Sequence, residues 1–250
     1  FAQAVVYDTS GAAVDSNSTY FSARVATLEE GRAKSRMLFN KLAVLVPPGA
    51  YSARVLVIDA ASKRSFETLI DDIVVPPLES TRLTIGGPTL AYQVSQVDSG
   101  MAGINERMVK SGLYILNAPA GLFAETDTAA YLYAELYGLR PGENSTSQFQ
   151  TSVQVSDAAG TFSRDLGWKS ALKPGGPAAV TQSIDISNWP AGRYHVKLTA
   201  VDPSVSDTVS TTTSLRILPT LDTTAIEDET SAVNPYDSLT LKEKIELVTY

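Results

Sequence analysis

The only histidine of this 250-residue chain, His195, is the first candidate for chemistry. A hydrolase of the Ser-His-Asp type needs a histidine base that a carboxylate holds in place. The alternation of apolar and polar residues around Tyr194 puts His195 on the outward side of a strand, so we interpret it as an exposed strand residue. Because the chain has no cysteine, one histidine also cannot complete a zinc site.

Adjacent acidic residues suggest a calcium site, since calcium takes carboxylate oxygens as ligands. Asp71-Asp72 and Glu227-Asp228-Glu229 are the clusters of this kind. Neighbouring residues of a strand point to opposite faces, however, and no Asp-x-Asp-x-Asp spacing occurs. We therefore predict no catalytic residue, no metal site and no cofactor.

An aromatic strip near the middle of the chain is the third candidate. In the predicted strand 130–139, the side chains of Tyr131, Tyr133 and Glu135 share one face. Such a strip binds sugars or a protein partner, or else it forms a second core face or a contact between domains. The sequence leaves these alternatives open.

An internal repeat predicts the elements that position these residues. Residues 48–76 align without a gap with residues 191–219, which lie 143 positions later. The identical pairs are Gly49 and Gly192, Tyr51 and Tyr194, Asp59 and Asp202, and Pro76 and Pro219. A duplicated segment of this length indicates a duplicated structural unit.

The repeated Gly-x-Tyr motif predicts the fold class. In Greek-key sandwiches, a tyrosine at the corner leading into a strand donates a hydrogen bond to the backbone a few residues upstream. Tyr51 and Tyr194 are the predicted corners, and Asp59 and Asp202 are predicted to cap turns at the strand ends. The chain is therefore predicted to be all-β, with two tandem immunoglobulin-like Greek-key β-sandwich domains.

The two copies are unequal in length. Each has a predicted hairpin turn upstream, at residues 8–11 and 157–160, but only seven residues precede the first turn. We predict that the first sandwich lacks its opening strands, or that a partner supplies them by strand addition. The predicted segments are 1–80 for the first repeat, 81–219 for the second, and 220–250 for an acidic linker and the start of a short helix.

The strand after the first corner has an unusually apolar outer side. Tyr51, Ala53 and Val55 alternate toward the core, which leaves Leu56 and Ile58 on the opposite face. This face is either covered by another part of the structure or forms a partner-binding patch.

The charge distribution excludes some partner classes. The net charge is −7, and residues 219–250 carry −5 of it. With no basic stripe, the sequence argues against binding to nucleic acid or to an anionic membrane surface. No apolar run approaches the roughly 18 residues of a transmembrane helix.

The order of three segments resembles a known family. LYILNAPAGLFAETDTAAYLYAELYGL, DISNWPAGRYHVKLTAVD and NPYDSLTLKEKIELVTY resemble the front part of bacterial GWxTD domain-containing proteins. In that family, sandwich-like repeats lead into a helical region that carries the naming motif. Here Gly167-Trp168 is followed by Lys169, so the motif is absent and no functional residue carries over. The resemblance implies an extracytoplasmic bacterial location and a non-catalytic module.

Three hypotheses for function follow. The leading one is a non-catalytic structural or interaction module, an accessory or scaffold subunit that binds protein partners in an envelope or surface assembly. The first alternative is a carbohydrate-binding module that uses Tyr131 and Tyr133. The second is the non-catalytic part of an enzyme whose active site lies beyond Tyr250.

Overall fold

The computed structural model divides the chain into two compact units, which among the described residues are 1–77 with Glu106–Met108, and 82–97 with 109–219. The described part is 65% strand and contains no α-helix, so the predicted all-β class is confirmed. The predicted helix start lies outside the described residues. The structure describes residues 1–22, 27, 40–60, 63–77, 82–97, 106–140 and 147–219.

The described part of the first unit is one antiparallel sheet with the strand order β2-β1-β3-β4. The carboxylate of Asp8 closes the first hairpin, because its Oδ1 accepts the backbone N–H groups of Ser10 and Ala12 at 2.9 and 3.0 Å. The strands are β1 (Ala2–Asp8), β2 (Ala13–Thr19), β3 (Gly49–Ile58) and β4 (Ser65–Val75).

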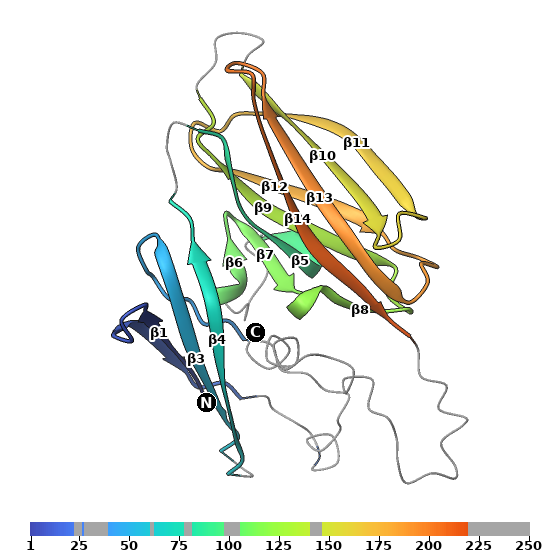
Figure 1. Ribbon diagram of the computed structural model, residues 1–250. Coiled ribbons are helices and arrows are strands. Elements are labelled where there is room, and N and C mark those ends of the chain that lie inside the picture. The colour runs from blue at the N-terminus through green and yellow to red at the C-terminus, as the bar shows by residue number, and fades with distance from the viewer. Residues whose placement is uncertain are drawn as a thin grey trace, which may run out of the picture. The chain divides into compact units, whose positions relative to one another are not determined.

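The second unit contains two sheets, with the strand orders β11-β10-β13-β14-β8 and β12-β9-β5-β7-β6 (Figure 1). A short 3₁₀ helix, η2 (Pro119–Gly121), precedes β8 in this unit, whereas a second one, η1 (Glu106–Met108), is assigned to the first unit. The strands are β5 (Thr84–Gln96), β6 (Val109–Lys110), β7 (Leu113–Asn117), β8 (Leu122–Ala124), β9 (Ala129–Tyr137), β10 (Gln148–Asp157), β11 (Ser163–Leu172), β12 (Ala178–Asp185), β13 (Gly192–Asp202) and β14 (Asp207–Leu218).

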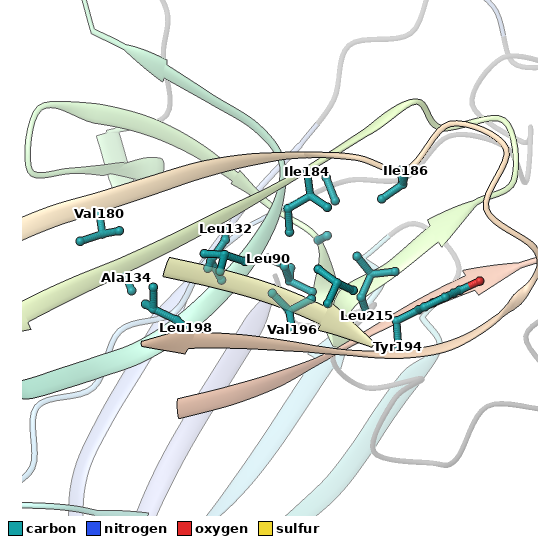
Figure 2. Close-up of a cluster of buried hydrophobic side chains, with 14 of the residues drawn as sticks. Leu90, Leu132, Ala134, Val180, Ile184, Ile186, Tyr194, Val196, Leu198 and Leu215 are labelled. Carbon is teal, nitrogen blue, oxygen red and sulfur yellow. The ribbon is translucent and has the colours of Figure 1, made fainter. Parts of the chain in front are cut away.

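A single hydrophobic core lies between the two sheets of the second unit (Figure 2). Leu132 and Leu136 of β9 belong to the same buried cluster as Val196 and Leu198 of β13, and all four side chains are at most 1% exposed. Alternate residues of each strand supply these side chains, which is the pattern of a strand that is buried on one face. This is a β-sandwich in which β13 lies between β10 and β14, as in immunoglobulin-type folds.

The repeat in the sequence is also a repeat in strand pairing. The order β2-β1-β3-β4 in the first unit corresponds to β11-β10-β13-β14 in the second. Asp8 pairs with Tyr51 in the first unit, and Asp157 pairs with Tyr194 in the second. The two copies therefore share register as well as topology.

Both predicted tyrosine corners are present. The Tyr51 hydroxyl donates to the carbonyl oxygen of Pro47 at 2.7 Å, and the Tyr194 hydroxyl donates to that of Pro190 at 2.8 Å. Tyr194 is 4% exposed, and its ring centroid lies 5.0 Å from that of Trp189. The corner thus satisfies a backbone carbonyl while the tyrosine ring contributes to the core.

The junction between the repeats differs from its prediction. The sequence predicts a linker over residues 77–88 that includes a strand at Thr81–Ile85, followed by a separate strand at 89–97. In the structure β5 begins at Thr84 and continues through the Gly86-Gly87-Pro88 segment, where a register shift lets the ladder to β9 pass the proline. In the first unit, no counterpart of the sheet around β9 is found among the described residues. Its lack of opening strands stays a prediction.

We expect Tyr194→Phe to lower the free energy of unfolding of the second unit by about 1 kcal/mol, because the Pro190 carbonyl loses its donor. Both tryptophans of the chain, Trp168 and Trp189, lie in this unit, so urea unfolding followed by tryptophan fluorescence reports on it. Tyr51→Phe is the matched control and leaves this transition in place. An unchanged midpoint for Tyr194→Phe would contradict the assigned role.

Candidate functional site

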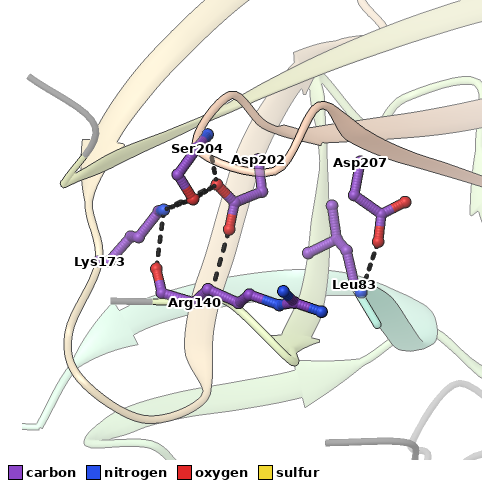
Figure 3. Close-up of polar contacts among 6 residues, drawn as sticks. All are labelled: Leu83, Arg140, Lys173, Asp202, Ser204 and Asp207. Carbon is purple, nitrogen blue, oxygen red and sulfur yellow. Dashed lines mark hydrogen bonds and ion pairs between the residues drawn. The ribbon is translucent and has the colours of Figure 1, made fainter. Parts of the chain in front are cut away.

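The most deeply buried charged group in the described structure is Asp202, at the end of β13 (Figure 3). Its side chain is 0% exposed, and Lys173, whose side chain is 5% exposed, lies 2.7 Å from its Oδ1. The same carboxylate accepts the backbone N–H groups of Ser204 at 3.0 Å and Arg140 at 3.1 Å. Asp202 therefore caps its turn, as predicted, and also connects two other loops.

The ammonium group of Lys173 also has its hydrogen-bonding partners within this cluster. Besides Asp202, Lys173 Nζ donates to the Arg140 carbonyl oxygen and to Ser204 Oγ, both at 2.8 Å. Burial alone raises the pKa of Asp202, but the bonds from Lys173, Ser204 and Arg140 outweigh it and hold the pKa below its ordinary value. We call Asp202, Lys173, Arg140 and Ser204 the loop clamp. Because Lys173 Nζ and the Asp202 carboxylate are buried and bonded within the cluster, the clamp has a structural role.

Asp59, the equivalent residue of the first unit, is exposed. Its backbone closes the turn between β3 and β4, where Asp59 N donates to Arg64 O and Lys63 N donates to Asp59 O, both at 2.9 Å. The loops that surround Asp202 follow β9 and β11, and β9 has no described counterpart in the first unit. Asp59 and Asp202 are thus equivalent in the sequence repeat, but Asp59 is exposed whereas Asp202 is buried.

A second polar cluster lies on the outer side of β9, at Glu135. The Tyr133 hydroxyl and Ser111 Oγ donate to Glu135 Oε1 at 2.7 and 2.9 Å. Lys110 Nζ lies 2.9 Å from Oε2, which also accepts the Tyr137 hydroxyl. Lys110 and Ser111 belong to the tight turn between β6 and β7, so the cluster ties this hairpin to β9.

Chemistry at Glu135 is limited by its surroundings. Burial raises its pKa, but the hydrogen bonds from Tyr137, Lys110, Tyr133 and Ser111 prevail and lower the pKa to about 2. Burial raises the pKa of Tyr133 to about 12, and the bond to Glu135 raises that of Tyr137 to about 12. A fixed carboxylate beside two neutral phenols does not exchange protons near neutral pH. This cluster is therefore structural.

The aromatic strip predicted as a glycan or partner surface is corrected by these contacts. Tyr133 is only 4% exposed and packs with Ala91 and Ile115, while Tyr131 is partly buried against the same group. The reason is that β5 and β7 place apolar side chains on the outer side of this sheet, which makes a second small core. The Tyr133 ring therefore does not offer the open face that a sugar platform needs, and Tyr131 is left as a single, partly buried ring.

The other residues that the sequence suggested for catalysis or metal binding do not come together in the described part of the chain. His195 is exposed on β13, and its register neighbours are Ser156 and Ser214 rather than a carboxylate. Asp71 and Asp72 are exposed on β4, while residues 227–229 lie outside the described part. The described residues contain no group of three or more His, Cys, Asp or Glu that could hold a metal ion.

The apolar residues predicted on the first unit's outer face are joined there by others. Gln3 of β1 lies opposite Leu56 of β3, and Val5 of β1 lies opposite Arg54 of β3. Arg54 in turn lies opposite Leu69 of β4. These side chains therefore share one face of the sheet. Leu69 is 57% exposed. Phe1 and Tyr20 extend this face, with ring centroids 4.9 Å apart. We call Phe1, Val5, Tyr20, Leu56, Ile58 and Leu69 the apolar outer face.

The same face of the second unit is polar. Thr199 and Thr212 stand 143 positions after Leu56 and Leu69, and strand pairing puts Gln154 where the first unit has Val5. The inner faces of both copies stay apolar, as the fold demands. The outer faces, which the fold leaves free, have diverged.

Comparison with protein-family models gives no match, and comparison with curated proteins gives none either. The relationship to GWxTD domain-containing proteins stays a prediction. No helix in the described part of the chain is long and apolar enough to cross a membrane.

We expect Lys173→Met to destabilise the second unit by about 3 kcal/mol, because Asp202 then stays buried without its cation. Urea unfolding followed by tryptophan fluorescence measures the change. Lys169→Met, at an exposed lysine of β11, the strand that Lys173 follows, is the matched control and stays within about 0.5 kcal/mol of the parent. Equal effects of the two substitutions would contradict the clamp.

We expect the stabilisation from Glu135 to depend on pH. Folding lowers its pKa from the ordinary 4.5 to about 2, so the stabilisation is complete above pH 4.5 and is lost as the pH falls through about 2. Glu135→Gln should therefore be less stable than the parent at pH 7, by about 2 kcal/mol. The difference should shrink toward pH 2 in unfolding curves recorded across this range, and a constant difference would exclude this role.

Proposed function

We propose that this protein is a non-catalytic interaction module whose apolar outer face binds a protein partner. The observation that carries the proposal is the contrast between the duplicated units: one outer face holds Val5, Leu56 and Leu69 where the other holds Gln154, Thr199 and Thr212. A shared fold does not require this difference. An exposed apolar patch is the usual mark of a contact surface.

The composition of the apolar outer face suits a protein partner. Aromatic and aliphatic side chains surround a single ion pair, in which Arg54 Nε lies 2.8 Å from Glu67 Oε1. Both charged side chains are about half exposed, at 48% and 50%. Apolar anchors with a few charged groups are typical of interfaces between proteins.

Strand addition to β4 is the second part of the proposal. In the second unit, β8 pairs in parallel with Arg216–Leu218 of β14. The equivalent stretch of the first unit, Ile73–Val75 in β4, pairs with β3 on one side, but among the described residues no strand pairs with its other side. Val74 in this stretch is 70% exposed. An extended partner segment that paired there would reproduce the arrangement of the second unit.

We also propose an extracytoplasmic bacterial location and a role as an accessory or scaffold subunit in an envelope assembly. Support comes from the order of segments that resembles GWxTD domain-containing proteins. Fractionation of native cells tests the location.

The alternative of an enzyme whose active site lies beyond Tyr250 is tested by the sequence that follows this residue. The proposal includes no catalytic site. It also leaves out the carbohydrate-binding alternative at Tyr131 and Tyr133, because Tyr133 is buried.

Photo-crosslinking tests the apolar outer face in native cells. A photoreactive phenylalanine analogue in place of Leu69 should form a discrete adduct with one protein, and Leu56→Asp should reduce that adduct at least tenfold, as expected for an interface anchor. The matched control places the same analogue at Thr212, where we expect no such adduct.

A second control uses Thr199→Asp, at the position in the second unit that corresponds to Leu56. This change should leave the adduct at position 69 intact. Equal adducts at positions 69 and 212, or a strictly monomeric full-length protein that forms none, would refute the proposed interface.

A further inference from the structure

The outer face of the second unit presents one large aromatic ring. Trp168 of β11 is 56% exposed, whereas the other tryptophan, Trp189, is 6% exposed. The indole N–H of Trp168 has no hydrogen-bond partner within the described part of the chain. An open ring with an unused donor is a group that a ligand can meet by stacking and by hydrogen bonding.

Most of the side chains that surround this ring are polar and uncharged. Trp168 lies opposite Ser152, which pairs with Thr199, and Thr199 Oγ1 lies 3.0 Å from Ser210 Oγ. The neighbouring exposed residues of the same face include Gln150, Gln154, Ser170 and Thr212, together with Asp165, Lys197 and Leu172. Hydroxyl and amide groups therefore continue across four strands next to the ring.

A β-bulge sets the position of Trp168. The ladder between β10 and β11 shifts register next to this residue, and Gly167 has φ of 77°, in the left-handed region that favours glycine. Asp165 holds the bulge, because its Oδ1 accepts the Gly167 N–H at 2.8 Å and its Oδ2 accepts Gln154 Nε2 at 3.3 Å. Bulges at a sheet edge redirect a side chain, here the one that follows the glycine.

We propose that this face, centred on Trp168, binds a neutral polysaccharide. The C–H face of a sugar ring packs on an indole, and its hydroxyls bond with serine, threonine and glutamine side chains. Lys197 is the one cation among these residues, so the face lacks the row of basic side chains that binding to a nucleic acid requires. Leu172, which is 70% exposed, is their one aliphatic side chain, whereas the apolar outer face of the first unit holds several. The proposal is independent of the protein-partner site.

Affinity electrophoresis tests this proposal on the full chain. Native gels would contain hydroxyethylcellulose, a β-1,3-glucan, a galactomannan, dextran or soluble starch as probes. We expect slowed migration in at least one gel. Trp168→Ala should lower the affinity at least tenfold, while Trp168→Phe should retain part of it because a ring remains.

Two controls separate this site from the partner site. Tyr20→Ala removes a ring that is 83% exposed in the first unit, and Leu69→Asp alters the apolar outer face. Because Leu69→Asp also adds a negative charge, each variant is compared with its own migration in a gel without polysaccharide, and both should be retarded as strongly as the parent. In solution, the retarding polysaccharide should also protect the parent's fluorescence from acrylamide, since Trp168 is the exposed tryptophan. No retardation with any probe, or equal retardation of Trp168→Ala, would overturn the proposal.

Discussion

The second unit depends on a carboxylate that has no access to water. Asp202 is 0% exposed, and an isolated charge in such a place would cost several kcal/mol. Lys173 and two backbone N–H groups offset that cost, and each comes from a different loop of the sandwich. Beside it, Asp207 of the same turn accepts the Leu83 N–H at 3.0 Å, at the entry to β5 (Figure 3). One turn thus holds the ends of both sheets in register.

This constraint explains why the two copies share a fold without sharing surfaces. Strand order, register and the tyrosine corner recur in both units because each satisfies backbone groups or buries a ring. None of these requirements acts on the outer side of the sheet. Selection could therefore change that side freely, and it holds leucines in one unit and threonines in the other. The two proposed sites lie on this unconstrained side.

Several features of the fold were predictable from the residues. The 143-residue spacing indicated equivalent strands, and the Gly-x-Tyr motif indicated a corner whose hydrogen bond spans only four residues. Such local signals depend on neighbours in the chain. The break predicted between strands at Thr81–Ile85 and 89–97 was wrong. A proline and two glycines favour a loop there, but a bulge in the ladder to β9 accommodates them within β5.

The candidate sites were harder to predict, since exposure depends on which strands come together. Alternation placed Tyr133 and Glu135 on one face of β9, but only the tertiary structure shows that β5 and β7 cover this face. In the sequence, Trp168 was considered only because Gly167-Trp168 matches the start of the GWxTD motif, which is otherwise absent. Its exposure follows from its place on an edge strand beside a bulge.

The sequence by itself determined the all-β class, the duplication, the corners and the apolar face at Leu56, because these follow from periodicity and local hydrogen bonding. Only the tertiary structure decided that Asp202 is buried with Lys173, that Tyr133 is covered and that Trp168 is open to solvent. The physical reason is that burial results from contacts between segments far apart in the chain, which no local pattern specifies.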